Sequence, residues 1–204
     1  MNKKVLLAAT NNDGKAKEIK QILGDFFQEI KSLKDLGLNI NPEENGSTFL
    51  ENAQIKARAV YNHIKGTMAV IADDSGLIVP ALNDEPGIMS ARYAGIDADD
   101  TKNNQKLLEK LKGMTDRRAY FICTVVLILP DGKEITAQGK VNGTILEKPE
   151  GGGGFGYDPI FFSDELKKSF GFAAPSEKNA ISHRARALNE LKQKFILEQG
   201  HIDD

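Results

Sequence analysis

Two adjacent carboxylates are the clearest candidate for chemistry in the sequence. Asp73 and Asp74 follow the apolar run 68–72 and precede Ser75. Neighbouring carboxylates at the end of a strand repel one another and gain most from a bound cation, and Mg²⁺ binds through one or two carboxylates together with substrate phosphates. Such a cation acidifies water, and a nearby carboxylate can take the released proton. An ordinary acidic turn after a strand is the alternative interpretation.

Further ligands for such a cation must come from oxygen atoms. Glu43 and Glu44 lie in the loop before the next predicted helix, and one of them can reach the cation if this loop folds over the sheet. Cys123 is the sole cysteine, which excludes an internal disulfide and makes a thiolate metal site implausible. A magnesium site is therefore the expected kind of metal site.

A polar segment of six residues has the composition of a phosphate-binding loop. It carries hydroxyl, amide, ammonium and backbone N–H groups just before a predicted helix, whose N-terminus favours anions. The residues are Thr10, Asn11, Asn12, Asp13, Gly14 and Lys15. The glycine spacing and the Lys-Ser/Thr ending of a Walker A loop are absent. A polar cap on an ordinary helix is the alternative.

Four consecutive glycines, at 151–154, precede the aromatic residues Phe155 and Tyr157. Glycines let a backbone approach a ligand closely or act as a hinge, and an aromatic face can stack on a base. A flexible surface loop with Phe155 anchored in the core is the alternative, and the aromatic residues alone do not decide between the two.

Positive charge gathers near the start of the last predicted helix. Lys178 and the run Ser182-His183-Arg184 place cationic groups and N–H donors where an anion or the polar edge of a base could bind. Arg184 can donate two parallel hydrogen bonds. A histidine at a helix start is more often a cap or a satisfied surface group than a catalyst.

Alternating strands and helices are expected to position these residues, because ligands in α/β sheets bind at the carboxyl ends of strands. Apolar runs predict strands at 5–9, 68–72, 119–129 and 133–141, with the last two joined as a hairpin through Pro130-Asp131-Gly132. Helical spacing and caps predict helices at about 16–23, 48–63, 101–111 and from Ser182 onward.

The composition fits a single folded domain over residues 1–204. The chain is short for two independent domains, and its 40% hydrophobic and 27% charged residues argue against disorder. A net charge of −2 lacks the basic excess of a nucleic-acid-binding protein. No apolar run approaches the length of a signal peptide core or a membrane span. We therefore expect a cytoplasmic protein that binds neither nucleic acid nor membrane.

Seven segments together resemble the inosine/xanthosine triphosphate pyrophosphatase family, also called the Ham1-like family. They occur in the family's order and spacing and cover nearly the whole chain. The segments are Thr10 to Lys15, Glu44, Phe49 to Ala53, Ala72 to Leu77, Pro86 to Tyr93, Phe155 to Pro159 and Ser182 to Arg184. Asn11 departs from the family, because many relatives have glycine at this position.

The resemblance implies an α/β fold with two lobes around a long mixed twisted sheet, helices on both faces and a central substrate cleft. The implied reaction is Mg²⁺-dependent hydrolysis of inosine, deoxyinosine or xanthosine triphosphate between the α and β phosphates, which yields a monophosphate and pyrophosphate. A homodimer is implied as well.

The resemblance also assigns roles to individual residues. Glu44 and Asp74 would bind the metal, and Asp74 would be the proton acceptor. The triphosphate would be held by Thr10, Asn11, Asn12, Asp13, Gly14, Lys15 and Ser75. The base and sugar would be contacted by Phe155, Gly156, Tyr157, Asp158, Lys178, His183 and Arg184, with Phe155 stacking on the base.

Two other functions remain open from the sequence. One is a pyrophosphatase that acts on pyrimidine or modified nucleoside triphosphates, resembling the related Maf proteins. The other is a non-catalytic nucleotide-binding module, against which the intact acidic cluster argues. A panel of triphosphates with separate detection of pyrophosphate and orthophosphate distinguishes the three.

Overall fold

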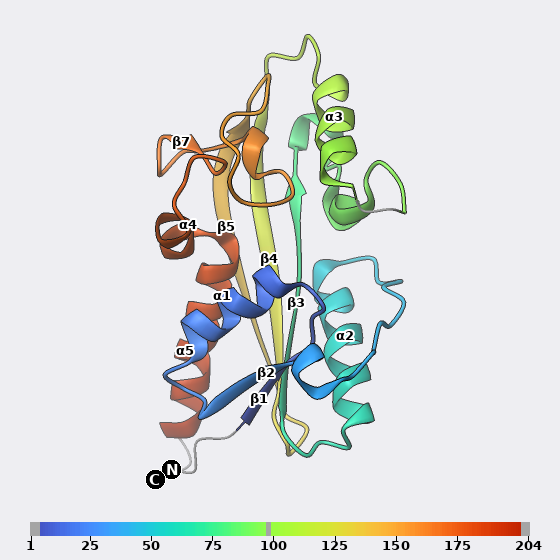
Figure 1. Ribbon diagram of the computed structural model, residues 1–204, viewed down its shortest axis with the longest axis vertical. Helices are drawn as coiled ribbons and strands as arrows, with labels where there is room; N and C mark the ends of the chain where they lie inside the picture. Colours follow the sequence, from blue (N-terminus) through green and yellow to red (C-terminus); the bar gives the residue numbers. More distant parts are fainter. Residues whose placement is uncertain (1–4, 97–98, 201–204) are drawn as a thin grey trace. The chain divides into compact units, whose positions relative to one another are not determined.

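The computed structural model describes residues 5–96 and 99–200 and has an α/β architecture (Figure 1). Its mixed seven-stranded sheet has the order β2-β1-β3-β4-β5-β6-β7, with β1 parallel to β2 and β3, and β6 antiparallel to β5 and β7. The strands are β1 (Val5–Ala8), β2 (Glu29–Ser32), β3 (Ala69–Ile78), β4 (Arg118–Ile128), β5 (Glu134–Ile145), β6 (Phe161–Ser163) and β7 (Lys168–Ser169). The α-helices are α1 (Asp13–Leu23), α2 (Phe49–His63), α3 (Asp100–Lys110), α4 (Pro175–Ile181) and α5 (His183–Gly200). The predicted α/β class is confirmed.

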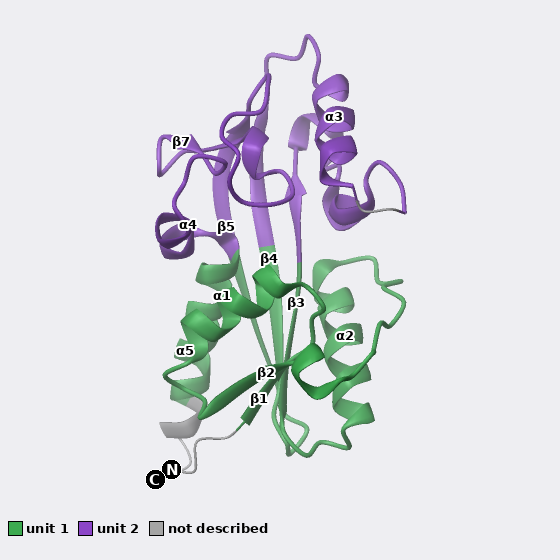
Figure 2. Cartoon of the chain, viewed as in Figure 1, with its two compact units in different colours: residues 1–74, 123–139, 184–204 green, residues 75–122, 140–183 purple. Residues whose placement is uncertain are grey.

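The chain forms two compact units, each assembled from separate stretches of sequence (Figure 2). Unit 1 comprises residues 1–74, 123–139 and 184–204, and unit 2 comprises 75–122 and 140–183. The boundaries fall within β3, β4, β5 and α5, and each of these elements therefore contributes residues to both units. The single domain expected over residues 1–204 stays a prediction.

Unit 1 has helices on both faces of its part of the sheet because its strands alternate buried side chains between the two faces. Leu6 and Ile71 belong to the core cluster that packs under α1 and α5. Leu7 and Val70, one residue away on each strand, belong to the cluster under α2. Figure 1 shows α1 and α5 on one side of these strands and α2 on the other.

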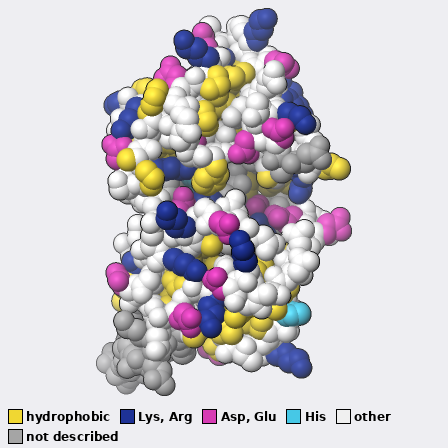
Figure 3. All heavy atoms as spheres, viewed as in Figure 1, with side chains coloured by type: hydrophobic (Ala, Val, Ile, Leu, Met, Phe, Trp, Pro, Cys, Tyr) yellow, Lys and Arg dark blue, Asp and Glu magenta, His cyan; other side chains and the backbone are white. Residues whose placement is uncertain are grey.

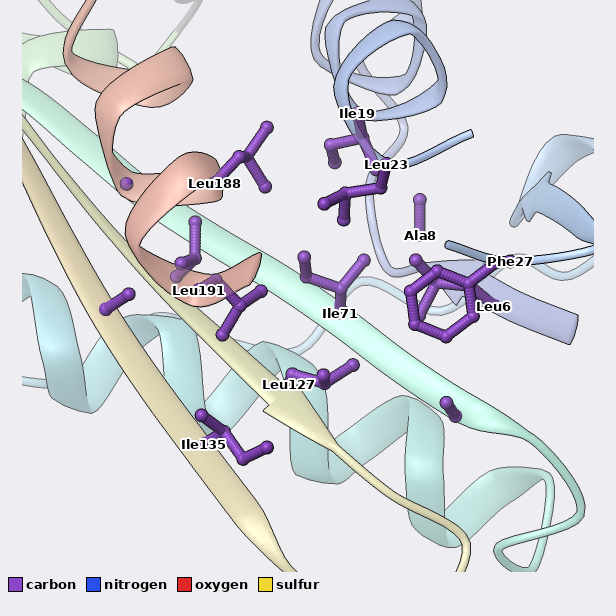
Figure 4. Close-up of a cluster of buried hydrophobic side chains, with 14 of the residues drawn as sticks. Leu6, Ala8, Ile19, Leu23, Phe27, Ile71, Leu127, Ile135, Leu188 and Leu191 are labelled. Atoms are coloured by element: carbon purple, nitrogen blue, oxygen red, sulfur yellow. The ribbon is translucent and has the colours of Figure 1, made fainter. Parts of the chain in front are cut away.

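The cluster under α1 and α5 is aliphatic at its centre (Figure 4). Ile19 and Leu23 of α1 and Leu188 and Leu191 of α5 face the strands, where they meet residues such as Ile71. All five side chains are at most 2% exposed. The helical spacing of Ile19 and Leu23, and that of Leu188 and Leu191, predicted the two helices.

The core of unit 2 is aromatic. The Phe121 ring centroid lies 4.6 Å from that of Phe161, and Phe161 lies 5.1 Å from Phe170. Leu107 and Leu111 from the α3 region join the same buried cluster. This core underlies the segment 154–158, which is described below.

The predicted end of the strand before Asp73 was wrong. The sequence indicated a strand that ended at Ala72, with Asp73, Asp74 and Ser75 in a turn, but all three lie inside β3. The strand continues because Leu77 and Ile78 are buried apolar residues that extend it, and because nearby cations compensate the two carboxylates. The short elements β2, β6, β7 and α4 were not predicted, whereas the hairpin of β4 and β5 was.

The face in view has no large patch of charge of one sign. Figure 3 shows Lys and Arg side chains interspersed with Asp and Glu on the face in view, in keeping with the net charge of −2. No described helix combines the length and the apolar character that crossing a membrane requires.

Truncation of Leu188 tests the core of unit 1. Leu188→Ala should lower the free energy of unfolding by about 2–5 kcal/mol, because it removes a fully buried side chain and leaves a cavity. Leu197→Ala on the same helix, at a side chain that is 64% exposed, should change it by less than about 0.5 kcal/mol. Urea denaturation measures both. Equal losses for the two variants would contradict this assignment of the core.

Candidate active site

Polar residues of unit 1 gather where the pairing of β1 with β3 ends. The last paired residues are Ala8 and Ile71, and the Ala9 N–H donates to the Ile71 carbonyl at 2.7 Å. The segment 10–15 follows β1, and Asp73 and Asp74 lie just beyond the last pair on β3. These residues therefore lie together at the carboxyl end of β1, although β3 itself continues.

The segment 10–15 is an ordered loop that leads into the first turn of α1. Thr10 Oγ1 accepts the Asn12 N–H at 3.1 Å, and Asn12 Oδ1 accepts the Lys15 N–H at 3.0 Å as the helix cap. Asn11 and Gly14 are exposed. Asn11 is not among the described non-glycine residues with positive φ, and it therefore replaces the family's glycine without strain. The loop can offer backbone N–H groups to an anion.

Asp73 and Asp74 face opposite sides of β3, because successive side chains of a strand alternate. Asp73 Oδ2 meets Lys15 Nζ at 2.9 Å on the side of α1 and α5. Asp74 Oδ1 instead meets Lys56 Nζ, from α2, at 2.8 Å. Each of the two carboxylates therefore has its own cationic partner.

Asp73 is the centre of a buried charge cluster. Its Oδ2 also accepts from Arg184 Nε at 3.2 Å, and Arg184 Nη1 donates to Glu18 Oε2 at 2.5 Å. Asp73 and Arg184 are 3% and 1% exposed. Burial alone would raise the pKa of Asp73, but the positive charges of Lys15, Arg184 and Lys56 outweigh it and hold this pKa well below its usual range. Two predicted substrate-binding cations, Lys15 and Arg184, thus meet at one structural carboxylate.

Asp74 and Glu44 converge on a single ammonium group. Lys56 Nζ lies 2.8 Å from Asp74 Oδ1 and 2.9 Å from Glu44 Oε2. The buried Asn52, one helical turn earlier on α2, donates from Nδ2 to Asp74 Oδ2 at 3.4 Å and accepts the Gly46 N–H at 2.9 Å. α2 therefore holds both oxygens of Asp74 and ties them to the loop that carries Glu44.

The sequence analysis did not single out Lys56 or Asn52. The segment 49–53 contributed only to the family resemblance, and Lys56 lies outside it. Their spacing of four residues on a predicted helix was a usable signal, because residues four apart share one helix face. This helix face could have been predicted to meet the acidic residues that precede and follow the helix in the sequence.

Burial raises the pKa of Asp74, the Lys56 ammonium opposes this, and the Glu44 carboxylate adds to the rise. Burial also disfavours the charged form of Lys56, but the charges of Asp74 and Asp73 outweigh it and raise the pKa of this lysine. Lys56 is therefore an ammonium at neutral pH. Burial keeps the pKa of Asp74 above that of an ordinary aspartate even beside this ammonium.

The donor set at Glu44 and Asp74 fits a hard cation that keeps several waters. Both carboxylates reach one cationic nitrogen, and two carboxylates supplemented by phosphate oxygens are typical of magnesium sites. Among residues 5–96 and 99–200, no group of three or more His, Cys, Asp and Glu side chains could hold a metal by itself.

In unit 2, Asp158 organises the segment that contains Phe155. Asp158 Oδ2 accepts the Phe155 N–H at 2.9 Å and meets Lys178 Nζ at 2.6 Å. The ammonium lies 4.3 Å from the centre of the Phe155 ring. Phe155 is 41% exposed, and the alternative that it anchors the loop in the core is wrong. Gly154 has a φ of +78°, and an added Cβ would lie 2.2 Å from Asp158 Oδ2.

Two of the preceding glycines lie against another segment of the chain. The Gly153 N–H donates to the Gly171 carbonyl at 2.9 Å, and a Cβ on Gly151 would lie 2.3 Å from the Gly171 backbone. Gly151 and Gly153 therefore lie close to the backbone of another segment of the chain. A role of the glycine run in approaching a ligand or as a hinge stays a prediction. Gly156 is fixed as well, because its N–H donates to Asp100 Oδ2 at 2.7 Å.

Three other predicted site residues are buried or half-buried. The Tyr157 ring is buried, and its hydroxyl donates to the Ser90 carbonyl at 2.8 Å. His183 is buried as the first residue of α5, and its ring stacks on Phe121 at 4.9 Å between centroids. Ser75 lies half-buried within β3. In unit 2 the structure thus groups Phe155, Asp158 and Lys178.

Comparison with known proteins decides the family. A family model described as the Ham1 family matches residues 6–194. The chain belongs to the Ham1 family. This Ham1-family chain is 50% identical to a dITP/XTP pyrophosphatase of Clostridium perfringens over 94% of its own length and 97% of the relative. It is 46% identical to a dITP/XTP pyrophosphatase of Thermoanaerobacter pseudethanolicus, over 95% and 97%.

Solved structures of the Ham1 family share the fold. A Ham1 protein of Staphylococcus aureus matches with a TM-score of 0.85 and 42% identity over 96% of this chain and all of that one. A structure from Mycobacterium abscessus, described as nucleoside-triphosphatase / dITP/XTP pyrophosphatase, matches with a TM-score of 0.74 and 40% identity, over 92% and 98%. The resemblance seen in the sequence is confirmed.

Replacement of Asp73 tests its structural role. Asp73→Asn should lower the free energy of unfolding by about 3 kcal/mol at pH 7, because it removes the carboxylate shared by Lys15 and the buried Arg184 and leaves Arg184 with Glu18 alone. The pKa of Asp73 lies below its unfolded value of about 3.9. Its contribution is therefore fully present above that pH and is lost as the pH falls through the folded pKa. Urea denaturation between pH 3 and pH 8 measures the difference from the unchanged protein, which should shrink below about pH 4.

Asp116→Asn is the matched control, because Asp116 also pairs with an arginine, Arg118, but on the surface. Its cost should stay below about 1 kcal/mol. A cost for Asp73→Asn that equals the control, or that grows as the pH falls, would contradict the buried-cluster assignment.

Proposed function

We propose that this Ham1-family chain hydrolyses inosine, deoxyinosine and xanthosine triphosphates between the α and β phosphates, with Mg²⁺, to a monophosphate and pyrophosphate. The observation that carries the proposal is the convergence of Glu44 and Asp74 on one cationic position. The printed names of its relatives, dITP/XTP pyrophosphatase, support the substrate class.

Unit 1 supplies the groups proposed to bind the triphosphate and the cation. Glu44 and Asp74 would hold Mg²⁺, which when bound acidifies water and screens the phosphate charge. The loop 10–15 at the start of α1 would offer backbone N–H groups and Lys15 to the phosphates. Ser75, the first residue of unit 2, would add its hydroxyl. Lys56 joins this group as a cation that the sequence analysis missed.

Asp74 is the proposed proton acceptor. Its carboxylate lies beside the position proposed for the cation, where it could take the proton of a water that the cation acidifies. Asn52 holds Asp74 Oδ2 by a hydrogen bond, and this fixes the orientation of the carboxylate as it receives the proton.

Unit 2 supplies the groups proposed for the base and sugar. The exposed ring of Phe155 would stack on the base, while Lys178 and Asp158 hold that ring and its backbone in place. Gly156, Tyr157 and His183 complete the predicted set, with Tyr157 acting through the position of its backbone because its ring is buried. Donors aimed at the 6-oxo group of hypoxanthine or xanthine would stay unpaired against adenine.

Arg184 takes a modified role in this proposal. Two of its donors are bonded to Asp73 and Glu18, and we therefore assign it a contribution of positive charge beside Lys15 instead of bidentate recognition of the base. The homodimer and the cytoplasmic location remain predictions, and light scattering measures the first of them.

A panel of nucleoside triphosphates tests the proposed reaction. With Mg²⁺, inosine, deoxyinosine and xanthosine triphosphates should yield pyrophosphate, with little turnover of ATP, GTP or pyrimidine triphosphates. Pyrophosphate and orthophosphate are measured separately. Orthophosphate as the primary product would exclude the reaction, and a preference for pyrimidine or modified nucleotides would favour the Maf-like alternative.

Asp74→Asn tests the proposed base. It should reduce kcat by about 10²–10⁴-fold, because the attacking water loses its proton acceptor. Asp25→Asn, at an exposed residue, should leave kcat unchanged. Circular dichroism checks that both variants fold, and full activity in a folded Asp74→Asn protein would refute this mechanism.

Phe155→Ala tests stacking on the base. It should raise KM by about 5- to 150-fold, the equivalent of the roughly 1–3 kcal/mol that one stacked base contributes. Phe155→Tyr keeps the aromatic face and should restore KM. Phe172→Ala removes another exposed ring, 63% exposed, and should leave KM unchanged. Equal effects of Phe155→Ala and Phe172→Ala would show that the stacking residue is wrongly assigned.

A further inference from the structure

Lys56 fills the point at which the two proposed metal ligands meet. Its ammonium lies within 2.9 Å of two carboxylates, that of Glu44 in the loop before α2 and that of Asp74 in β3. The Lys56 side chain is 15% exposed and the Asp74 side chain 12%. This ammonium is therefore the resident positive charge of a largely enclosed acidic pair.

A divalent cation cannot share this position with the ammonium. Mg²⁺ binds its oxygen ligands at about 2.0–2.1 Å, whereas the ammonium stands 2.8 Å from Asp74 Oδ1. A cation held by both carboxylates would lie in the space of the Lys56 ammonium, and the two positive charges would repel at that separation. Binding of the cation therefore requires Lys56 to withdraw.

The rest of the pair is held independently of Lys56. Asn52 donates to Asp74 Oδ2, and its own carbonyl oxygen accepts the Gly46 N–H two residues after Glu44. An added Cβ on Gly46 would lie 2.7 Å from Asn52 Oδ1, which shows how closely the loop approaches this amide. Asn52 is neutral and need not move, while the flexible four-carbon stem of Lys56 allows its charge to move.

We infer that Lys56 is a built-in counter-cation, which neutralises Glu44 and Asp74 until a divalent cation takes its place and then transfers its charge to the phosphates of the substrate. The identity of those phosphates rests on the proposed function. Cation and triphosphate then bind with positive coupling. The cation releases the Lys56 ammonium from the carboxylates, and the triphosphate gives this ammonium a new partner. The coupling is equal in both directions.

The first experiment measures Mn²⁺ binding to the full-length protein without nucleotide, from the electron paramagnetic resonance signal of free Mn²⁺. Lys56→Met should bind Mn²⁺ at least ~10-fold more tightly than the unchanged protein, equivalent to about 1.4 kcal/mol. Lys56→Arg keeps the charge and should bind as weakly as the unchanged protein. Arg58→Met removes a charge from the same helix, where Arg58 pairs with Glu134, and should change nothing.

The second experiment measures binding of the α,β-methylene analogue of inosine triphosphate in the presence of EDTA. Lys56→Met should weaken this binding about 10-fold, which is again about 1.4 kcal/mol, because without Lys56 the charges of Glu44 and Asp74 are uncompensated and repel the phosphates. Opposite changes in the two affinities identify a counter-cation, since a merely structural lysine would weaken both. Circular dichroism and Tm establish that the variant folds, and Lys56→Gln replaces it if it does not.

The inference would be overturned if folded Lys56→Met or Lys56→Gln bound Mn²⁺ no more tightly than the unchanged protein. The Mn²⁺ measurement contains no nucleotide, and its outcome therefore does not depend on the reaction. Absence of pyrophosphate release from the triphosphate panel would refute the proposed function and leave the Mn²⁺ result standing.

Discussion

The alternation of side chains along β3 determines how this protein uses its two adjacent carboxylates. Asp73 points toward α1 and α5 and is neutralised by Lys15 and Arg184, whereas Asp74 points toward α2 and meets Lys56 and Asn52. A strand places consecutive side chains on opposite faces. One carboxylate can therefore be committed to a buried structural cluster while its neighbour stays available for a cation and for proton transfer.

Asp158 has a comparable organising role within unit 2. A single carboxylate oxygen holds the Phe155 backbone and the Lys178 ammonium, and Lys178 in turn lies over the Phe155 ring. The aromatic face stays exposed although the residues that hold it are buried. In unit 2, a buried ion pair thus holds a neighbouring aromatic ring that stays exposed.

Local sequence signals predicted the elements with strong periodicity and the residues on loops. The helical spacing of Ile19, Leu23, Leu188 and Leu191 gave α1 and α5, and the polar composition of 10–15 gave the loop at the end of β1. Asp73 and Asp74 were placed beyond the strand because the apolar run ends at Ala72, whereas their pairing with cations distant in sequence, such as Arg184, lets β3 continue through them. Lys56 was missed for the same reason, since its partners come from a loop and from another strand.

The central claim is that the cation binds between Glu44 and Asp74 in place of the Lys56 ammonium. A crystal of the protein with Mn²⁺ and the α,β-methylene analogue of inosine triphosphate tests this directly through anomalous scattering. The account predicts one Mn²⁺ peak within coordination distance of both carboxylates, with Lys56 turned to a phosphate and Asp73 still bonded to Lys15 or Arg184. A peak bound by Asp73, or a Lys56 ammonium still bridging Glu44 and Asp74 beside the bound analogue, would contradict it.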